Sequence, residues 1–270
     1  MIPKIQHEPV IEKPGAKALR LERLEDVRNT FIHAWNGYKA QAWGEDELRP
    51  VMGGFKTPFC GWAATMVDSL DTLWIMGLYD EFELALKELE KVDFTHTVGC
   101  KVNLFETTIR HLGGLLSAFD VSGGKRVILI QKAVELAEVL YTAFDTPNRM
   151  PSAHFTWSAT NPEAQDHLPS QSVALAVLGS LQLEFTRLAR ITGNDKYFDA
   201  VQRVMDQLEK WQMKTSLPGM WPAEVNARHS NTSIAIGSPV DNSPELFTLG
   251  SLADSTYEYL PKVCRAHTRA

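Results

Sequence analysis

Two side chains of opposite charge, Glu106 and Arg110, stand four residues apart near the start of a predicted helix and therefore share one of its faces. Such pairs are most often exposed ion pairs that contribute little to stability. Here the neighbours Leu104, Phe105 and Ile109 are apolar, which favours a partly buried pair. A buried carboxyl group can keep its proton at neutral pH. The segment therefore indicates either a surface ion pair or a carboxylic acid able to donate a proton.

A second segment places two acids, Asp254 and Glu258, four residues apart on one helix face. Like charges at this spacing slightly destabilise a solvated helix, whereas a sugar or metal site would give them a purpose. The alternative is that Asp254 caps the helix or bonds to a loop. The spacing alone leaves both interpretations open.

Two further acids, Asp68 and Asp71, interrupt an otherwise apolar helical stretch. A buried carboxylate without a polar partner is costly, so both need hydrogen-bond or charge partners. We expect them to be structural groups that support a site, with direct participation in catalysis as the alternative.

The sequence lacks the motifs of several other functional classes. His111 and His154 form no HExxH-like pair, which argues against a histidine-bound metal. No GxSxG segment, Walker loop or dinucleotide fingerprint occurs. The formal net charge is -6 and no stretch is rich in Lys and Arg, which argues against a nucleic-acid partner. An uncharged or weakly polar ligand fits better.

Length and composition indicate an ordinary soluble globular protein, because 44% of the 270 residues are apolar and 22% are charged. Residues 1–14 show neither the apolar core of a signal peptide nor a membrane-spanning segment, so the chain as written would stay in the cytosol. The sequon at Asn231 fits secretory passage or chance. Cys60, Cys100 and Cys264 lack the spacing of a zinc or redox site and the density of a disulfide scaffold, and say little about compartment.

Helical periodicity dominates the chain. In the first stretch, apolar residues recur every three or four positions, which predicts a helix face that packs in the core. This apolar stripe consists of Leu21, Leu24, Val27, Phe31, Trp35 and Tyr38. Further helices are predicted over residues 64–76, 80–91, 104–119, 126–143, 171–191, 195–211 and 247–260. No strand-like run of comparable strength competes, so the predicted class is all-α, with about eight helices.

Short polar turns that contain glycine predict αα-hairpins at residues 76–80, 121–124 and 191–195. The segments 112–115 and 178–181 precede two of these turns in similar ways, which suggests a repeated hairpin. Such hairpins stack as an open superhelix or close into an αα-toroid. The long irregular stretches 146–170 and 214–245 favour the toroid, with loops that shape a carbohydrate cleft or are ordinary surface loops. The last predicted helix has no partner, so we expect a chain that is cut short.

With these segments in view, the sequence resembles the class I α-mannosidases, glycoside hydrolase family 47, from about residue 21 to residue 262. The resemblance is carried by five blocks in the right order, at residues 34–39, 67–76, 103–116, 179–185 and 254–260. We accordingly divide the chain into an extended segment 1–18, the N-terminal part of a catalytic domain at 19–262, and a divergent tail at 263–270.

The resemblance implies an (α/α)7 barrel, incomplete here, that binds one calcium ion. It also implies hydrolysis of terminal α-1,2-linked mannose in high-mannose N-glycans with inversion at the anomeric carbon. Glu106 matches the proposed general acid, Arg110 would hold that carboxyl group, and Asp254 matches a second active-site acid that assists protonation or positions water. The family's base and its calcium ligands belong to a C-terminal half that this chain lacks, so we expect the chain to be inactive alone.

Two positions bear on the glycan that would be recognised. At Leu252 the endoplasmic-reticulum enzymes of the family have an arginine that restricts branch choice, and leucine resembles the Golgi or secreted fungal type. At Val177 the family commonly has a glutamate in the glycan cleft, so an acceptor for a sugar hydroxyl is missing. The alternative to a mannosidase is therefore a glycan-binding quality-control protein of the same fold without efficient hydrolysis. The resemblance alone places the protein in the lumen of the secretory pathway or outside the cell, although no signal peptide or anchor is present.

Overall fold

The computed structural model describes residues 11–158, 168–228 and 245–267, and the sequon at Asn231 lies outside them. The all-α prediction is confirmed. The helices are α1 (Pro14–Gln41), α2 (Ala64–Asp68), α3 (Leu70–Ile75), α4 (Tyr79–Leu89), α5 (Leu104–Thr107), α6 (Gly113–Val121), α7 (Val127–Tyr141), α8 (Leu175–Gly179), α9 (Gln182–Thr192), α10 (Lys196–Gln212) and α11 (Asp254–His267). A π-helical turn η1 (Thr108–Leu112) joins α5 to α6, and a 3₁₀ turn η2 (Thr142–Phe144) follows α7. Within the described residues, no helix has the length and apolar content needed to cross a membrane.

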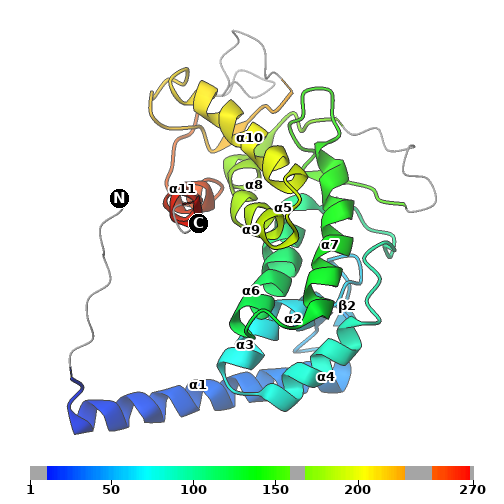
Figure 1. Cartoon of the computed structure of the whole chain (residues 1–270), viewed down its shortest axis with the longest axis vertical. Helices are drawn as coiled ribbons and strands as arrows, with labels where there is room; N and C mark the ends of the chain where they lie inside the picture. Colours follow the sequence, from blue (N-terminus) through cyan, green and yellow to red (C-terminus); the bar gives the residue numbers. More distant parts are fainter. Residues whose placement is uncertain (1–10, 159–167, 229–244, 268–270) are drawn as a thin grey trace.

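The three predicted hairpins are present, because α3 packs on α4, α6 on α7, and α9 on α10. Figure 1 shows these pairs stacked one after another from the blue end of the chain to the yellow, with α11 next to α8. The turn after α9 ends in Gly193, whose φ of 67° is the left-handed conformation that glycine adopts without strain.

Two of the hairpins belong to a repeated unit, as the sequence suggested. In each, a two-residue strand leads into a broken helix, an outer helix follows, and a second short strand pairs with the first. β3 (Val102–Asn103) pairs antiparallel with β4 (His154–Phe155), and β5 (Val173–Ala174) pairs antiparallel with β6 (Glu224–Val225). The third small sheet is a local hairpin of β1 (Glu47–Leu48) and β2 (Phe55–Lys56). The sequence analysis missed the six strands found among the described residues, because two residues are too few to show a period.

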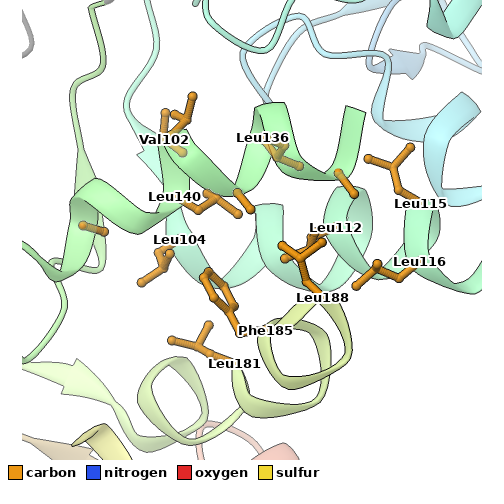
Figure 2. Close-up of a cluster of buried hydrophobic side chains, with 14 of the residues drawn as sticks. Val102, Leu104, Leu112, Leu115, Leu116, Leu136, Leu140, Leu181, Phe185 and Leu188 are labelled. Atoms are coloured by element: carbon orange, nitrogen blue, oxygen red, sulfur yellow. The ribbon is translucent and has the colours of Figure 1, made fainter. Parts of the chain in front are cut away.

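The core between the repeated units is made of leucine and phenylalanine side chains. Figure 2 shows Leu136 and Leu140 of α7 opposite Leu112 of η1, with Phe185 and Leu188 of α9 entering from the other side. All five are fully buried. The close approach of α6 to α2 depends on Gly114, since a Cβ there would lie 2.8 Å from the Val67 carbonyl oxygen. Through Leu112 this packing holds η1, the turn that carries Arg110.

The predicted core stripe of α1 is only half right. Trp35 and Tyr38 are buried, but the side chains of Leu21, Leu24 and Val27 are 48%, 55% and 59% exposed. In Figure 1 the first half of α1 extends away from the other helices, so nothing described covers this face. Periodicity detects an apolar face, but it does not say whether a partner covers that face. Because α1 begins at Pro14, residues 14–18 are helical rather than extended.

Two other predicted boundaries were wrong. The helix expected at 171–191 begins at Leu175 and breaks between α8 and α9. The helix expected at 247–260 begins only at Asp254, because the preceding residues form a turn in which Leu252 has a φ of 74°. It then runs to His267 and contains Pro261.

Cys60 and Cys100 form a disulfide that the spacing of the cysteines did not reveal. The bond closes a loop of 40 residues and joins the segment before α2 to the segment before β3. Cross-linking a loop of this size stabilises a domain by about 3–4 kcal/mol in the chain-entropy view.

Candidate active site

Glu106 is the third residue of α5 and is held there by a cap. The side-chain Oδ1 of Asn103 accepts a hydrogen bond from the Glu106 backbone N–H at 3.0 Å. The Asn103 amide nitrogen lies 3.1 Å from His154 Nε2 on the paired strand β4. The small sheet and the cap together fix where the helix begins, and hence where the carboxyl group lies.

Arg110 contacts that carboxyl group with two nitrogens. Its Nε donates to Glu106 Oε2 at 2.8 Å, and Nη2 lies 2.7 Å from the same oxygen. The two side chains are 30% and 38% exposed, so the pair is partly buried, between the two alternatives that the sequence allowed. Arg110 belongs to the π-helical turn η1. Single π turns inside α-helices frequently occur at functional sites.

The guanidinium of Arg110 has two further neighbours. It lies over the ring of Phe59, with 5.3 Å from Cζ to the ring centroid, and its Nη1 is 3.9 Å from Asp68 Oδ2. Burial raises the pKa of Asp68, the Arg110 charge lowers it, and Asp71 raises it further. Asp68 is therefore an electrostatic neighbour of the Glu106–Arg110 pair.

Asp71 is the structural group that the sequence predicted. Its Oδ2 accepts a hydrogen bond from the Ser117 hydroxyl at 2.6 Å, and its Oδ1 accepts one from Thr72 at 3.2 Å. The first bond ties α3 to α6. This contact meets the need for a partner in an apolar helix.

Asp254 is exposed at the first turn of α11, and Ser255 N–H donates to its Oδ1 at 2.9 Å. Glu258 is exposed as well and lies 3.5 Å from Lys262 Nζ. The bond to Ser255 agrees with the interpretation of Asp254 as a helix-capping residue. Glu258 is paired with the Lys262 cation rather than placed in a site that it shares with Asp254. α8 contacts both α5 and α11, so it lies between the helices that carry Glu106 and Asp254. That the two carboxyl groups face one another stays a prediction.

The two positions expected to bear on glycan recognition, Val177 and Leu252, are neighbours. The backbone N–H of Ala176, next to Val177 in α8, donates to the carbonyl oxygen of Leu252 at 2.8 Å. Leu252 precedes α11 and its side chain is 45% exposed, whereas Val177 is half-buried. α8 and α11 are pressed together behind them, since Thr256 Oγ1 donates to the Leu175 carbonyl at 3.0 Å.

An acid that the sequence analysis did not single out, Glu184, is half-buried, with a buried carboxylate oxygen, and lies between three helices. Its Oε1 accepts a hydrogen bond from the Tyr259 hydroxyl at 2.8 Å, and its Oε2 has no partner among the described residues. A Cβ added to Gly113 would lie 3.6 Å from Oε1. Burial raises the pKa of Glu184 to about 7 against weaker opposing effects, which include the Tyr259 hydrogen bond.

His111, adjacent to Arg110, is fully buried among aromatic rings. It meets Phe59, Trp62 and Phe94 edge to face, with centroids 6.1–6.2 Å apart. Neither ring nitrogen makes a hydrogen bond of good geometry in the described parts of the chain. Burial lowers the pKa of His111 to about 3; the nearby Trp62 backbone opposes this in part, and the Arg110 charge adds a smaller lowering.

Sequence reasoning missed three residues around Glu106. Asn103 precedes Glu106 by three positions, which is the spacing of a capping box and was a usable signal. Phe59 and His154 carried no signal, because only the folded chain brings them to η1 and to Asn103. Over the described ranges, no group of three or more His, Cys, Asp or Glu side chains is arranged to hold a metal ion.

Three comparisons bear on the identity of the chain. The family described as Glycosyl hydrolase family 47 matches residues 30–269. The endoplasmic reticulum mannosyl-oligosaccharide 1,2-alpha-mannosidase of Rattus norvegicus is 40% identical over 245 residues, which are 89% of this chain and 34% of that protein. A mannosyl-oligosaccharide 1,2-alpha-mannosidase of Arabidopsis thaliana is 37% identical over 90% of this chain and 40% of its own length.

A solved structure gives the same result at the level of the fold. The alpha-1,2-mannosidase from Trichoderma reesei superposes with a TM-score of 0.73 at 30% sequence identity, over 89% of this chain and 50% of that one. The chain spans about a third of the length of the first curated relatives that it matches.

Proposed function

Because the chain belongs to glycosyl hydrolase family 47, we propose that the protein is an inverting glycosidase that removes terminal α-1,2-linked mannose from high-mannose N-glycans. The helical hairpins follow the fold of the family's (α/α)7 barrel, as the superposition on the Trichoderma reesei enzyme shows. The reaction and the sugar linkage are those in the names of the relatives, which are mannosyl-oligosaccharide 1,2-alpha-mannosidases.

The observation that carries the proposal is the Glu106–Arg110 pair. In an inverting glycosidase, a carboxylic acid protonates the leaving oxygen while a carboxylate on the opposite face of the sugar activates water. We assign Glu106 the role of the acid, acting directly or through a water. Nε and Nη2 of Arg110 both contact Oε2 of Glu106. The other oxygen, Oε1, is therefore available to carry the proton toward a substrate.

Asp254 is proposed as the second acid of the site. At the start of α11 its exposed carboxylate can position water or assist protonation, and the Ser255 N–H orients it. Leu252, two residues earlier, would contact the glycan. We do not assign the base to a residue of this chain.

Calcium is the metal expected for the family, and when bound it would help to hold the substrate. The described side chains form no cluster of acids that fits a calcium ion. No step of the proposed reaction is therefore assigned to calcium.

The compartment proposed for the protein is the lumen of the secretory pathway. High-mannose N-glycans are found there, and the Cys60–Cys100 disulfide supports the assignment, because disulfides persist in oxidising compartments.

The test is the release of mannose from a high-mannose glycan by the natural full-length protein and by its Glu106→Gln variant. Loss of release in the variant, with an unchanged melting temperature, is expected. Asp120→Asn is the matched control, since Asp120 also pairs with an arginine, Arg187, but near the C-terminal end of α6. Mannose release that persists in Glu106→Gln would refute the role of the acid.

The second candidate function is glycan binding without hydrolysis, and Val177 is the observation in its favour. It places an apolar side chain where the family commonly has a glutamate. Glycan binding with no shortened product in a mass profile of the wild-type reaction would select this function.

A further inference from the structure

We propose that Phe59 is a positioning residue for Glu106, and that it acts by holding the Arg110 guanidinium in place beneath that carboxyl group. The contact itself is independent of the reaction, whereas its importance for catalysis rests on the proposed function. Phe59 lies 47 positions before Glu106 in the chain, and its ring contacts Arg110.

Phe59 supplies the apolar side of the arginine's environment. Its ring centroid is 5.3 Å from Arg110 Cζ, within the range of a cation–π contact. The same ring meets the buried imidazole of His111 edge to face, at 6.2 Å and 62°. The ring therefore lies against two consecutive residues of η1, the turn that brings Arg110 to Glu106.

The backbone of Phe59 is held by a buried carboxylate. Asp46 is fully buried, and its Oδ2 accepts hydrogen bonds from the N–H groups of Phe59 at 2.8 Å and Gly61 at 2.9 Å. Its Oδ1 accepts one from Ala64 N–H at 3.2 Å. The next residue, Cys60, is buried and forms the disulfide with Cys100. These contacts leave the Phe59 ring little freedom to move away.

Arg110 needs this support because two carboxylates, those of Glu106 and Asp68, lie within its reach. Nη2 is 2.7 Å from Glu106 Oε2, while Nη1 is 3.9 Å from Asp68 Oδ2. Without the ring, the guanidinium could turn toward Asp68 or toward water. Glu106 would then lose the two donors that fix its orientation.

The test follows the Nε–H signal of Arg110 by nuclear magnetic resonance. We expect a resonance whose exchange with water is slowed by the bond to Glu106, and Arg110→Lys assigns it by removing it. In Phe59→Leu the exchange should accelerate about two- to fivefold. Phe59→Tyr and Phe59→Trp, which keep an aromatic face, should restore the slow exchange. The internal control is the Nε–H of Arg187, which donates to Asp120 Oδ2 at 2.9 Å and should not change in any Phe59 variant.

Reduction of the disulfide provides a second measurement without a substitution, and the Arg110 signal should again exchange faster while that of Arg187 does not. An unchanged Arg110 signal in folded Phe59→Leu overturns the proposal. So does equal acceleration of both arginine signals, which would indicate general loosening.

Mannose release separates this inference from the proposed function. If Glu106→Gln abolishes release and Phe59→Leu leaves kcat unchanged, the positioning role fails while the glycosidase assignment stands. If the full-length wild type releases no mannose, the assignment fails, and the Arg110 signal still decides whether Phe59 holds the pair.

Discussion

The hydroxyl of Tyr259 donates a 2.8 Å hydrogen bond to Glu184 Oε1 and so joins α11 to α9. Both side chains are half-buried, and the second carboxylate oxygen of Glu184 has no partner among the described residues. Because α11 also carries Asp254, the bond helps to position this second proposed acid relative to the α9–α10 hairpin.

The raised pKa of Glu184 predicts that this residue stabilises the folded protein more in mild acid than at alkaline pH. Burial raises the folded pKa of Glu184 from 4.5 to about 7, so the folded state binds the proton more tightly than the unfolded state. Its contribution is fully present below pH 4.5 and is lost as the pH rises through 7. The difference is roughly 3 kcal/mol. Urea unfolding of Glu184→Gln should lack this dependence and show higher stability than the wild type at pH 8.

Tyr259→Phe provides the control for Glu184. The hydrogen bond from Tyr259 lowers the pKa of Glu184, so its removal should move the loss of stability to higher pH. A stability profile of Glu184→Gln that parallels the wild type would show that the carboxyl group ionises freely in the folded protein.

His111 predicts an effect of the opposite sign. Its pKa is lowered from 6.5 to about 3 by burial, so the unfolded chain takes up a proton that the folded chain does not. The stabilising contribution is present above pH 6.5 and is lost as the pH falls toward 3. His111→Phe should therefore flatten the acid limb of the unfolding free energy. His33→Phe is the matched control, because His33 is exposed on α1 and its replacement should leave the acid limb as it is.

The close packing of α8 on α11 at Gly179 predicts that a larger side chain there destabilises the folded protein. A Cβ at this position would lie 2.3 Å from Cγ2 and Oγ1 of Thr256. Gly179→Ala should lower the free energy of unfolding by about 1–3 kcal/mol through overpacking, measured by urea titration. Gly15→Ala is the comparison, since nothing lies within 4 Å of a Cβ there, and it should be neutral or stabilising. Equal effects of the two substitutions would contradict the close contact.

The sequence predicted the helices and hairpins well because their apolar periodicity and glycine turns are local signals. It also predicted the Glu106–Arg110 pair, because a spacing of four positions on a helix places two side chains next to each other. Burial depended on the whole fold, and the apolar stripe of α1 illustrates this. Leu24 and Trp35 belong to one stripe, yet only Trp35 is buried.

The supports of the site were beyond sequence reasoning for a similar reason. Phe59 contacts Arg110 across 51 positions, and Cys60 reaches Cys100 across 40. Neither contact leaves a spacing that could be recognised. Glu184 was visible only as one acid in an amphipathic helix, because its burial depends on α6 and on Tyr259 of α11.

Leu252 gives the last prediction, which concerns the range of glycans processed. Its carbonyl is bound to Ala176 N–H, so the Leu252 turn is held against α8 beside Val177, and its side chain is 45% exposed. The resemblance described above implies that the family's endoplasmic-reticulum enzymes have an arginine here. Leu252→Arg should narrow the product profile, slowing removal of all but one mannose by roughly tenfold. Leucine and arginine are both unbranched at Cβ, so the φ of 74° should be equally tolerated.

The control for this variant comes from the same segment. Leu249 is 67% exposed, and Leu249→Arg adds the same charge three residues away from the Ala176 contact. If a positive charge acted through long-range attraction, both variants would change the mass profile of the glycan products in the same way. A change confined to Leu252→Arg is expected, because only that side chain extends from the turn that is fixed to α8. An unaltered profile in Leu252→Arg would show that the turn does not contact the glycan.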